Sequence, residues 1–294
     1  MAQKLVHHVS RAEFDLPHDV LVDFLNTRIF GKAQGFYVAE FPLWQLGCLL
    51  QENWLEEDIL NCMAELLYFR VSVTAADTSQ VFLYPPTNFF TDARRSFYST
   101  PRQYSAELLA LRERVRIAPK CEIGFNACLN SHFSAYYHGS TCYADLEHGD
   151  SLHQPHASDI LEIFQWIFSG VMDDERIPWH VKTDLGARQG MGNGGDGSCG
   201  IASHNFSERR IDADIPHWSG PTSHIFRDRA LRDLLVYHHI ASKRHGESFL
   251  GTWTTCCVDS VIKTGLSVNP FCAYNDFNVF TPRVSKPFVI PFWS

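Results

Sequence analysis

The sequence predicts an α+β fold in which a central mixed β-sheet is flanked by helices. Two stretches, 54–69 and 225–242, repeat apolar residues at helical spacing. Between them, residues 121–139 are rich in aromatic and β-prone side chains, as expected of neighbouring strands. Helical spacing returns at 157–169. This order of helix, strands and further helices is typical of one sheet with helices packed around it.

In the first half of the chain, the strongest signals are helical. Residues 17–28 space their apolar side chains for a short helix, with Pro17 near its start. The clearest amphipathic helix is WLEEDILNCMAELLYF (54–69), whose acids at 56–58 lie in the first turn, where the helix dipole favours negative charge. The other elements expected here are strands at 70–74 and 80–84, separated by a turn, and a helix at 103–116.

The second half is expected to carry the rest of the sheet. The segments CEIGFNACL (121–129), HFSAYYHG (132–139) and CYADL (142–146) are predicted to be strands. Helices are expected at 157–169 and 225–242, and the residues after Cys199 can begin another. The C-terminal residues hold short apolar runs split by prolines, which favours strands or extended packing over helix.

Composition narrows the classes of function. The 294 residues are 45% hydrophobic and carry a formal charge of −8, so a sizeable core is expected and a general nucleic-acid binder is not. No apolar run is long enough to span a bilayer, and the N-terminal MAQKLVHHVS lacks the apolar region of a signal peptide. The nine cysteines include no CxxC pair, and an odd count in a long chain favours free thiols. We therefore expect an intracellular protein, nuclear or cytoplasmic.

The glycine-rich stretch GMGNGGDGSCG (190–200) permits three interpretations. It contains a GxGxxG pattern, but the preceding VKTDLGARQ is polar rather than a buried strand, which argues against a dinucleotide site. It lacks the Gly-Lys-Ser/Thr of a phosphate loop. The third interpretation is a reactive thiol: Cys199 would begin a helix, whose N-terminus stabilises a thiolate. Taken alone, however, a cysteine in a loop is more often a small buried side chain without chemistry.

A cysteine nucleophile needs a base and a residue that orients the base. His132 stands at the start of an aromatic strand, and Asp150 follows the next strand-like segment, so neighbouring strands would hold them side by side. Asp145 is a rival acid, but it lies close to His132 in the sequence for a returning strand. The histidines around Asp150 match no usual zinc spacing, and we expect neither a metal nor a cofactor.

The order His, Asp, Cys-Gly resembles that of the SUMO-specific (ubiquitin-like protein) proteases, a branch of the adenain-like cysteine peptidases. The resemblance covers about residues 40 to 240 and rests on motifs in the family's order. These motifs are WLEEDILNCMAELL (54–67), VFLYPPTNFF (81–90), IGFNACLNSHF (123–133), GDSLH (149–153) and GDGSCG (195–200). It implies an adenain-like architecture and cleavage after the Gly-Gly terminus of a SUMO-like modifier.

The resemblance also implies roles for individual residues. Cys199 would be the nucleophile, His132 the base and Asp150 the residue that orients it. The family threads Gly-Gly through a tunnel between two tryptophans; Trp54 fits one wall, and Phe133 stands where the second tryptophan is expected. The family's oxyanion glutamine corresponds in position to Asn193, whereas Gln189 lies further upstream. Gln189 is favoured, because the extra glycines are typical of a lengthened loop through which it could reach the oxyanion, and the shorter Asn193 amide is the alternative.

Two other functions remain open at this stage. One is a different enzyme on the same scaffold, either an acyltransferase or a protease for another ubiquitin-like modifier. The other is an inactive module that binds the modifier. The expected domain organisation is an N-terminal helical extension (1–35), a catalytic domain (36–242) and a C-terminal extension packed on it (243–294). The sequence does not predict an oligomeric state.

Overall fold

The computed structural model describes residues 1–11, 14–26, 29–36, 41–74, 81–84, 88–118, 121–139, 145–184, 186–190 and 195–248. They form two compact units: Glu52–Ser223, and Met1–Gln51 together with the described chain from His224 onward. The described parts of 36–51 and 224–242 belong to this latter unit. The unit around the sheet is therefore shorter than the predicted catalytic domain, whose limits stay a prediction.

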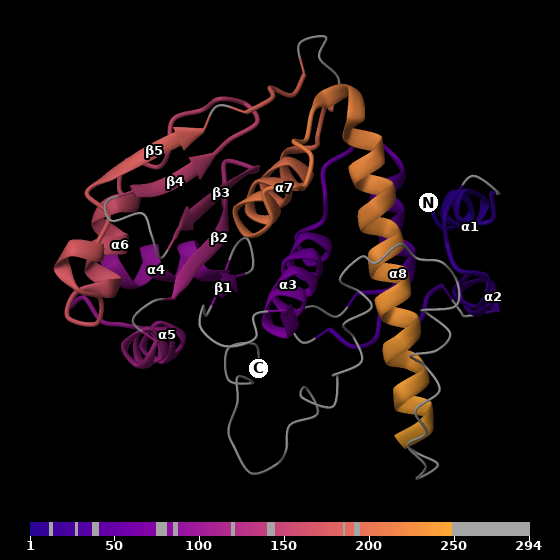
Figure 1. Cartoon of the computed structure of the whole chain (residues 1–294), viewed down its shortest axis with the longest axis horizontal. Helices are drawn as coiled ribbons and strands as arrows, with labels where there is room; N and C mark the ends of the chain where they lie inside the picture. The colour runs from indigo at the N-terminus through magenta and orange to yellow at the C-terminus, as the bar shows by residue number, and fades with distance from the viewer. Residues whose placement is uncertain are drawn as a thin grey trace. The chain divides into compact units, whose positions relative to one another are not determined.

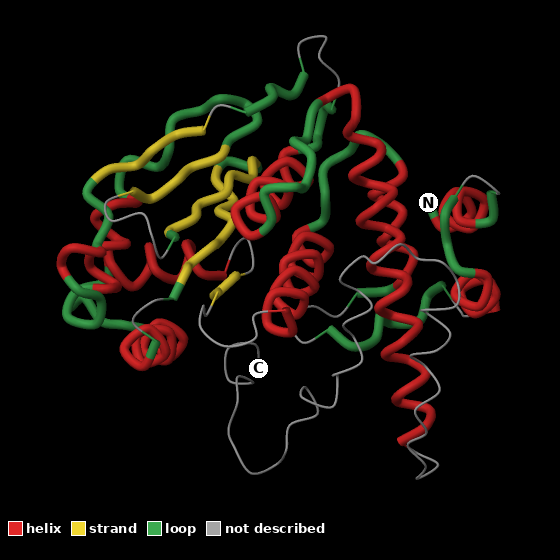
Figure 2. Tube along the Cα trace, in the orientation of Figure 1, coloured by secondary structure: helices red, strands yellow, loops and turns green. Residues whose placement is uncertain are grey.

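Within the described residues, the unit Glu52–Ser223 is built on a five-stranded mixed sheet (Figures 1 and 2). Its strands, in spatial order, are β1 (Val81–Tyr84), β2 (Glu122–Leu129), β3 (His132–His138), β4 (Asp145–Gly149) and β5 (His180–Asp184). The inner pairs β2–β3 and β3–β4 are antiparallel, and the outer pairs β1–β2 and β4–β5 are parallel. Every residue of β3 is buried, so the centre of the sheet is covered on both faces.

Helices cover this sheet on both faces (Figure 1). The helices of this unit are α3 (Glu57–Thr74), α4 (Asn88–Tyr98), α5 (Ala106–Ile117), α6 (Ile160–Phe168) and α7 (Cys199–Ile211). Phe125 of β2 and Tyr136 of β3 are register partners that stack with Phe90 of α4. Because side chains alternate along a strand, the partners Cys128 and Phe133 face the other way, toward α7.

The unit that contains the N-terminus is helical. Its elements are α1 (Ala2–Val9), α2 (His18–Asn26), the 3-10 helix η1 (Leu43–Leu50) and α8 (Ser223–Ser248), of which Ser223 belongs to the other unit. His239 of α8 binds two carboxylates of α2, with Nδ1 2.8 Å from Asp23 and Nε2 3.2 Å from Asp19. None of the described helices, α8 included, combines the length and the apolar character that crossing a membrane requires.

Several local predictions were wrong. Residues 70–74 were expected as a strand because of their β-branched side chains, yet they continue α3. A helix already formed over the preceding turns extends at little cost, which outweighs a weak local propensity. The stretch VKTDLGARQ (181–189) is polar and was not expected to be a strand, yet its first four residues belong to β5 (His180–Asp184), an exposed sheet edge that needs no apolar run. Helix α4 was not predicted, whereas α1 lies within the predicted N-terminal helical extension. Of the strand expected at 142–146, only Asp145 and Leu146 are described, and they begin β4 (Asp145–Gly149).

Candidate active site

His132 and Asp150 meet inside the unit Glu52–Ser223. His132 is the first residue of β3, and Asp150 directly follows β4, its antiparallel neighbour. Nε2 of His132 lies 2.8 Å from Oδ2 of Asp150. The two side chains are only 6% and 3% exposed. The strand pairing therefore brings together the base and the acid that the sequence predicted.

The carboxylate of Asp150 is held by its own turn. Its Oδ1 accepts hydrogen bonds from the backbone N–H of Leu152 at 2.7 Å and of Gln154 at 3.2 Å, which leaves Oδ2 to face His132. This local pattern is the usual side-chain-to-backbone bonding of an aspartate at a turn. The rival Asp145 lies at the other end of β4, where its Oδ1 is 2.6 Å from Nε2 of His180.

Cys199 is the first residue of α7 and is fully buried. It packs with Leu60 of α3 and Phe133 of β3. The loop before it turns at Gly195 and Gly197, whose φ angles of +73° and +75° lie in the left-handed region that favours glycine. A Cβ on Gly197 would lie 2.8 to 3.0 Å from backbone atoms of residues 52–54. The glycines thus allow this loop to lie directly against the segment that contains Trp54.

Electrostatics favour a protonated His132 beside an ionised Asp150. Burial opposes the imidazolium, but the hydrogen bond to Asp150 and the neighbouring Cys199 outweigh it and raise the pKa of His132 to about 9. Burial likewise opposes the Asp150 carboxylate, yet its bond to His132 and its backbone partners lower the pKa of Asp150 below its usual 3.8. Nδ1 of His132 is buried without a partner among the described residues, which leaves that nitrogen for the thiol. A thiolate–imidazolium pair needs this arrangement.

Of the two candidate oxyanion residues, Gln189 lies beside the acid. Its side-chain Oε1 accepts a hydrogen bond from Ser151 Oγ at 3.0 Å, and its backbone N–H donates to the Ser151 carbonyl at 2.9 Å. Because Ser151 follows Asp150, these bonds tie Gln189 to the turn that carries the acid. Gln189 as a whole is only 5% exposed. Asn193 lies outside the described residues.

The two predicted tunnel residues differ in exposure. Trp54 is 54% exposed and lies in the segment before α3. Phe133 is buried at 6% within the cluster that holds Cys199. Of these two aromatic side chains, Trp54 therefore lies on the surface, while Phe133 forms part of the packing around Cys199. Their role as walls of a substrate tunnel stays a prediction.

Sequence reasoning missed a polar cluster directly before the nucleophile. The hydroxyl of Ser198, the residue preceding Cys199, lies 2.5 Å from Oε2 of Glu52 and 2.8 Å from the hydroxyl of Ser223. Ser223 also donates to Glu52 at 2.9 Å. Both serines are fully buried. These residues come from distant parts of the chain, and no local pattern identified them.

The sequence matches no protein-family model and no curated protein. The structure is similar to that of the C-terminal Ulp1 protease domain in complex with Smt3, the yeast ortholog of SUMO. The TM-score is 0.51 at 15% identity, over 81% of this chain and 96% of that one. For the SUMO protease Ulp1 with its catalytic cysteine oxidised to a sulfenic acid, the TM-score is 0.53 at 14% identity, over 81% and 97%.

These likenesses span nearly the whole of the solved domains. At such low sequence identity, these likenesses show a similar backbone arrangement and not the roles of individual side chains. The predicted α+β class, with a central mixed sheet flanked by helices, is confirmed. The chain thus has the fold of the Ulp1 SUMO protease domain.

Proposed function

We propose that this protein is a cysteine peptidase or isopeptidase that cleaves after the Gly-Gly terminus of a SUMO-like modifier. The observation that carries the proposal is the buried 2.8 Å contact between His132 and Asp150, in the same unit as a cysteine that begins a helix. The likeness to a protease domain solved with Smt3 supports the choice of modifier. No cofactor takes part in the proposed chemistry.

The reaction proceeds in two stages. The Cys199 thiolate attacks the carbonyl carbon of the terminal glycine, and the oxyanion accepts hydrogen bonds from the Cys199 backbone N–H and from Gln189 or Asn193. His132, oriented by Asp150, gives its proton to the leaving amine, and a thioester remains. Water then gives a proton to His132 and attacks the thioester, which releases the modifier and restores the thiol. Trp54 would line the path of the narrow Gly-Gly tail.

Electrophile-tipped probes test this proposal directly. Probes built on SUMO, on ubiquitin and on a third ubiquitin-like modifier are incubated with the wild type, Cys199→Ala and Cys128→Ala. Cys128 is a partly exposed thiol next to the same cluster and is the matched control. The expected result is one covalent adduct with the SUMO probe, kept in Cys128→Ala, lost in Cys199→Ala and located on Cys199 by mass spectrometry.

Other outcomes would overturn the proposal in defined ways. An adduct with a different probe only would assign a protease for another modifier. No adduct with any probe, together with tight modifier binding, would indicate an inactive binding module. No adduct and no binding would leave an acyltransferase on the same scaffold. Full peptidase turnover by Cys199→Ala would exclude the thiol as nucleophile.

A further inference from the structure

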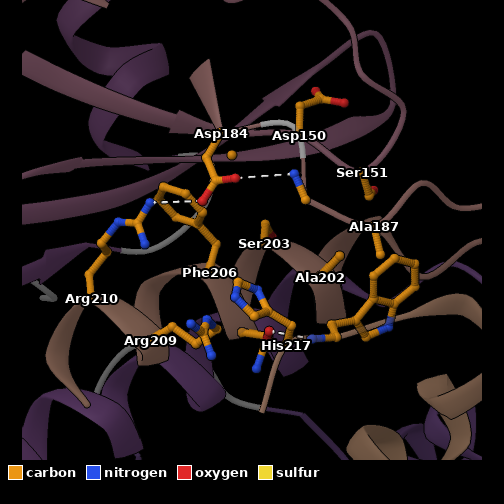
Figure 3. A pocket seen from close by; sticks show the side chains of 14 residues that line it. Asp150, Ser151, Asp184, Ala187, Ala202, Ser203, Phe206, Arg209, Arg210 and His217 are labelled. Atoms are coloured by element: carbon orange, nitrogen blue, oxygen red, sulfur yellow. Dashed lines mark hydrogen bonds and ion pairs between the residues drawn. The ribbon is translucent and has the colours of Figure 1, made fainter. Parts of the chain in front are cut away.

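A separate pocket of about 460 Å³, counting the open solvent at its mouth, lies along α7 in the unit Glu52–Ser223 (Figure 3). One wall is the turn after β4, with Asp150 and Ser151, and another is the segment after β5. The side of α7 and the following residues His217 and Trp218 complete it. Cys199 is not among its lining residues, so this is not the nucleophile's own cleft.

The two carboxylates in the pocket wall are already compensated. Asp150 is bound to His132 at 2.8 Å. Asp184 accepts a hydrogen bond from Arg210 at 3.0 Å, and Arg210 in turn lies 2.5 Å from Glu147. Figure 3 shows the bond between Asp184 and Arg210 on one side of the pocket. Because both carboxylates already have partners, they do not neutralise Arg209, the remaining charged residue that lines the pocket.

Arg209 and Trp218, in contrast, carry donors that the described residues do not satisfy. Arg209 lies within ion-pair distance of no carboxylate among them. Its Nη1 donates to the Ile215 carbonyl, and its Nε is buried without a partner. Trp218 is 4% exposed, and its Nε1 is also buried without a partner. A buried N–H group left unpaired lowers the stability of the fold by about 1–3 kcal/mol. A hydrogen-bond acceptor that reached either donor would recover this free energy.

The surroundings hold Trp218 in place. Its backbone N–H donates to Asn205 Oδ1 at 2.8 Å. Its ring packs against Gly195 so closely that a Cβ built on that glycine would lie 2.7 Å from the ring. Asn205 is itself fixed by a bond from Nδ2 to the Pro216 carbonyl at 3.0 Å. The Trp218 side chain is therefore a preorganised donor rather than a mobile one. Arg209 and Trp218 both line the pocket. A fixed N–H donor and an arginine without a carboxylate partner are usual elements of an oxyanion site.

We infer that this pocket binds one small oxyanion, a phosphate or carboxylate group, through Arg209 and the indole N–H of Trp218. The small apolar side chains of Ala187 and Ala202 also line the pocket (Figure 3). Asp150 and Ser151 form part of the wall, and Ser151 donates a hydrogen bond to Gln189, so an occupant would lie beside Asp150 of the proposed catalytic set. The inference does not depend on the proposed protease activity, and its test does not use that activity.

The test is an NMR titration of the ¹⁵N-labelled full-length chain. Inorganic phosphate, acetate and, at matched ionic strength, chloride are added in a phosphate-free buffer. The seven tryptophans give separate indole N–H resonances, and Trp218→Phe identifies the one of interest while retaining an aromatic ring against Gly195. The expected result is a saturable shift of the Trp218 signal with phosphate or acetate, and none with chloride. The stronger of the two anions defines the group that the pocket takes.

Substitutions make the result specific. Arg209→Gln removes the charge but keeps an amide that can reach Ile215, and it is expected to weaken anion binding at least about tenfold. Arg116→Gln, on an exposed turn of α5 where Arg116 pairs with Glu113, is the control and should bind like the wild type. Trp218→Phe is scored by the loss of the anion-dependent rise in melting temperature. A non-saturating shift, a shift shared with chloride, or equal affinity in Arg209→Gln would overturn the inference.

Discussion

At the scale of single residues, the proposed site depends on a few side chains held by short-range bonds. Asp150 is oriented by two backbone N–H groups of its own turn, and it meets His132 across one strand pair. Burial alone would disfavour the imidazolium. The raised pKa of His132 therefore shows that the Asp150 carboxylate and the neighbouring Cys199 thiol together outweigh the effect of desolvation.

The pKa of His132 provides the first prediction. In the wild type, NMR titration should give a value near 9, and in Asp150→Asn it should fall to or below the ordinary 6.5, because burial then acts with less opposition. Asp145→Asn, which removes the rival acid bound to His180, should leave the His132 value unchanged. An unchanged value in Asp150→Asn would show that Asp150 does not control the base.

The same pair predicts a pH window of stability. The raised pKa of His132 means that its contribution is complete below 6.5 and is lost as pH rises through about 9. The lowered pKa of Asp150 means that its contribution is present above 3.8 and is lost as pH falls further. The stability difference between the wild type and Asp150→Asn, from urea unfolding, should therefore be largest between about pH 4 and 6.5. A difference that grows toward pH 9 would contradict this coupling.

Gly197 provides a test of the nucleophile loop. Gly197→Ala should lower the free energy of unfolding by more than about 1 kcal/mol, because φ is +75° and the new Cβ would meet backbone atoms. Gly170→Ala is the matched control: its φ of +73° carries the same strain, but a Cβ there meets nothing within 4 Å. Denaturant unfolding gives both values, and equal losses would mean that the close approach to residues 52–54 is unimportant.

At the scale of elements, α7 links the site to the sheet. Its first residue is Cys199, and near its end Arg210 binds Glu147 of β4 and Asp184 of β5. The start of the helix is fixed differently, through the Ser198 hydroxyl and the Glu52 carboxylate. The position of Cys199 therefore depends on contacts at both ends of one helix.

Substitutions in the hydroxyl cluster before α7 can distinguish an effect on the stability of the fold from an effect on the position of Cys199. Ser198→Ala and Ser223→Ala each remove one hydrogen bond to Glu52, and each should cost about 1–3 kcal/mol of unfolding free energy. Only Ser198 adjoins Cys199, so Ser198→Ala should also slow adduct formation with the reactive modifier probe, more than Ser223→Ala does. Equal rates in the two variants would limit this cluster to a structural role.

At the scale of the whole molecule, each compact unit contains a histidine buried in its neutral form. His148 stacks on Tyr136 in the sheet unit, at 4.8 Å between ring centroids. His238 accepts a hydrogen bond from the Gln34 backbone in the other unit, at 2.9 Å. In both cases burial, the largest influence, lowers the pKa to about 4. Acid therefore disfavours both units, since the unfolded chain binds these protons more readily.

Acid sensitivity follows with a definite sign. Because the folded pKa of each histidine lies below the ordinary 6.5, stability is full above that pH and is lost as pH falls toward about 4. Each group contributes at most about 3 kcal/mol by linkage. His148→Gln and His238→Gln should each reduce the loss of melting temperature between pH 7 and 5, whereas His224→Gln, at an exposed position, should not. An unchanged pH slope in both variants would contradict this account.

The sequence by itself determined the fold class, most helices and the strands at 121–139, and it singled out His132, Asp150 and Cys199 as candidate site residues. These features can be predicted because local periodicity and short motifs depend only on residues that are neighbours in the sequence. Only the tertiary structure decided that Asp150 rather than Asp145 meets His132, that residues 70–74 continue a helix, and that polar residues 180–184 form an edge strand. It also assembled the Glu52 cluster and the pocket of Arg209 and Trp218. Their members lie far apart in the chain, and long-range packing, which no local pattern encodes, brings them together.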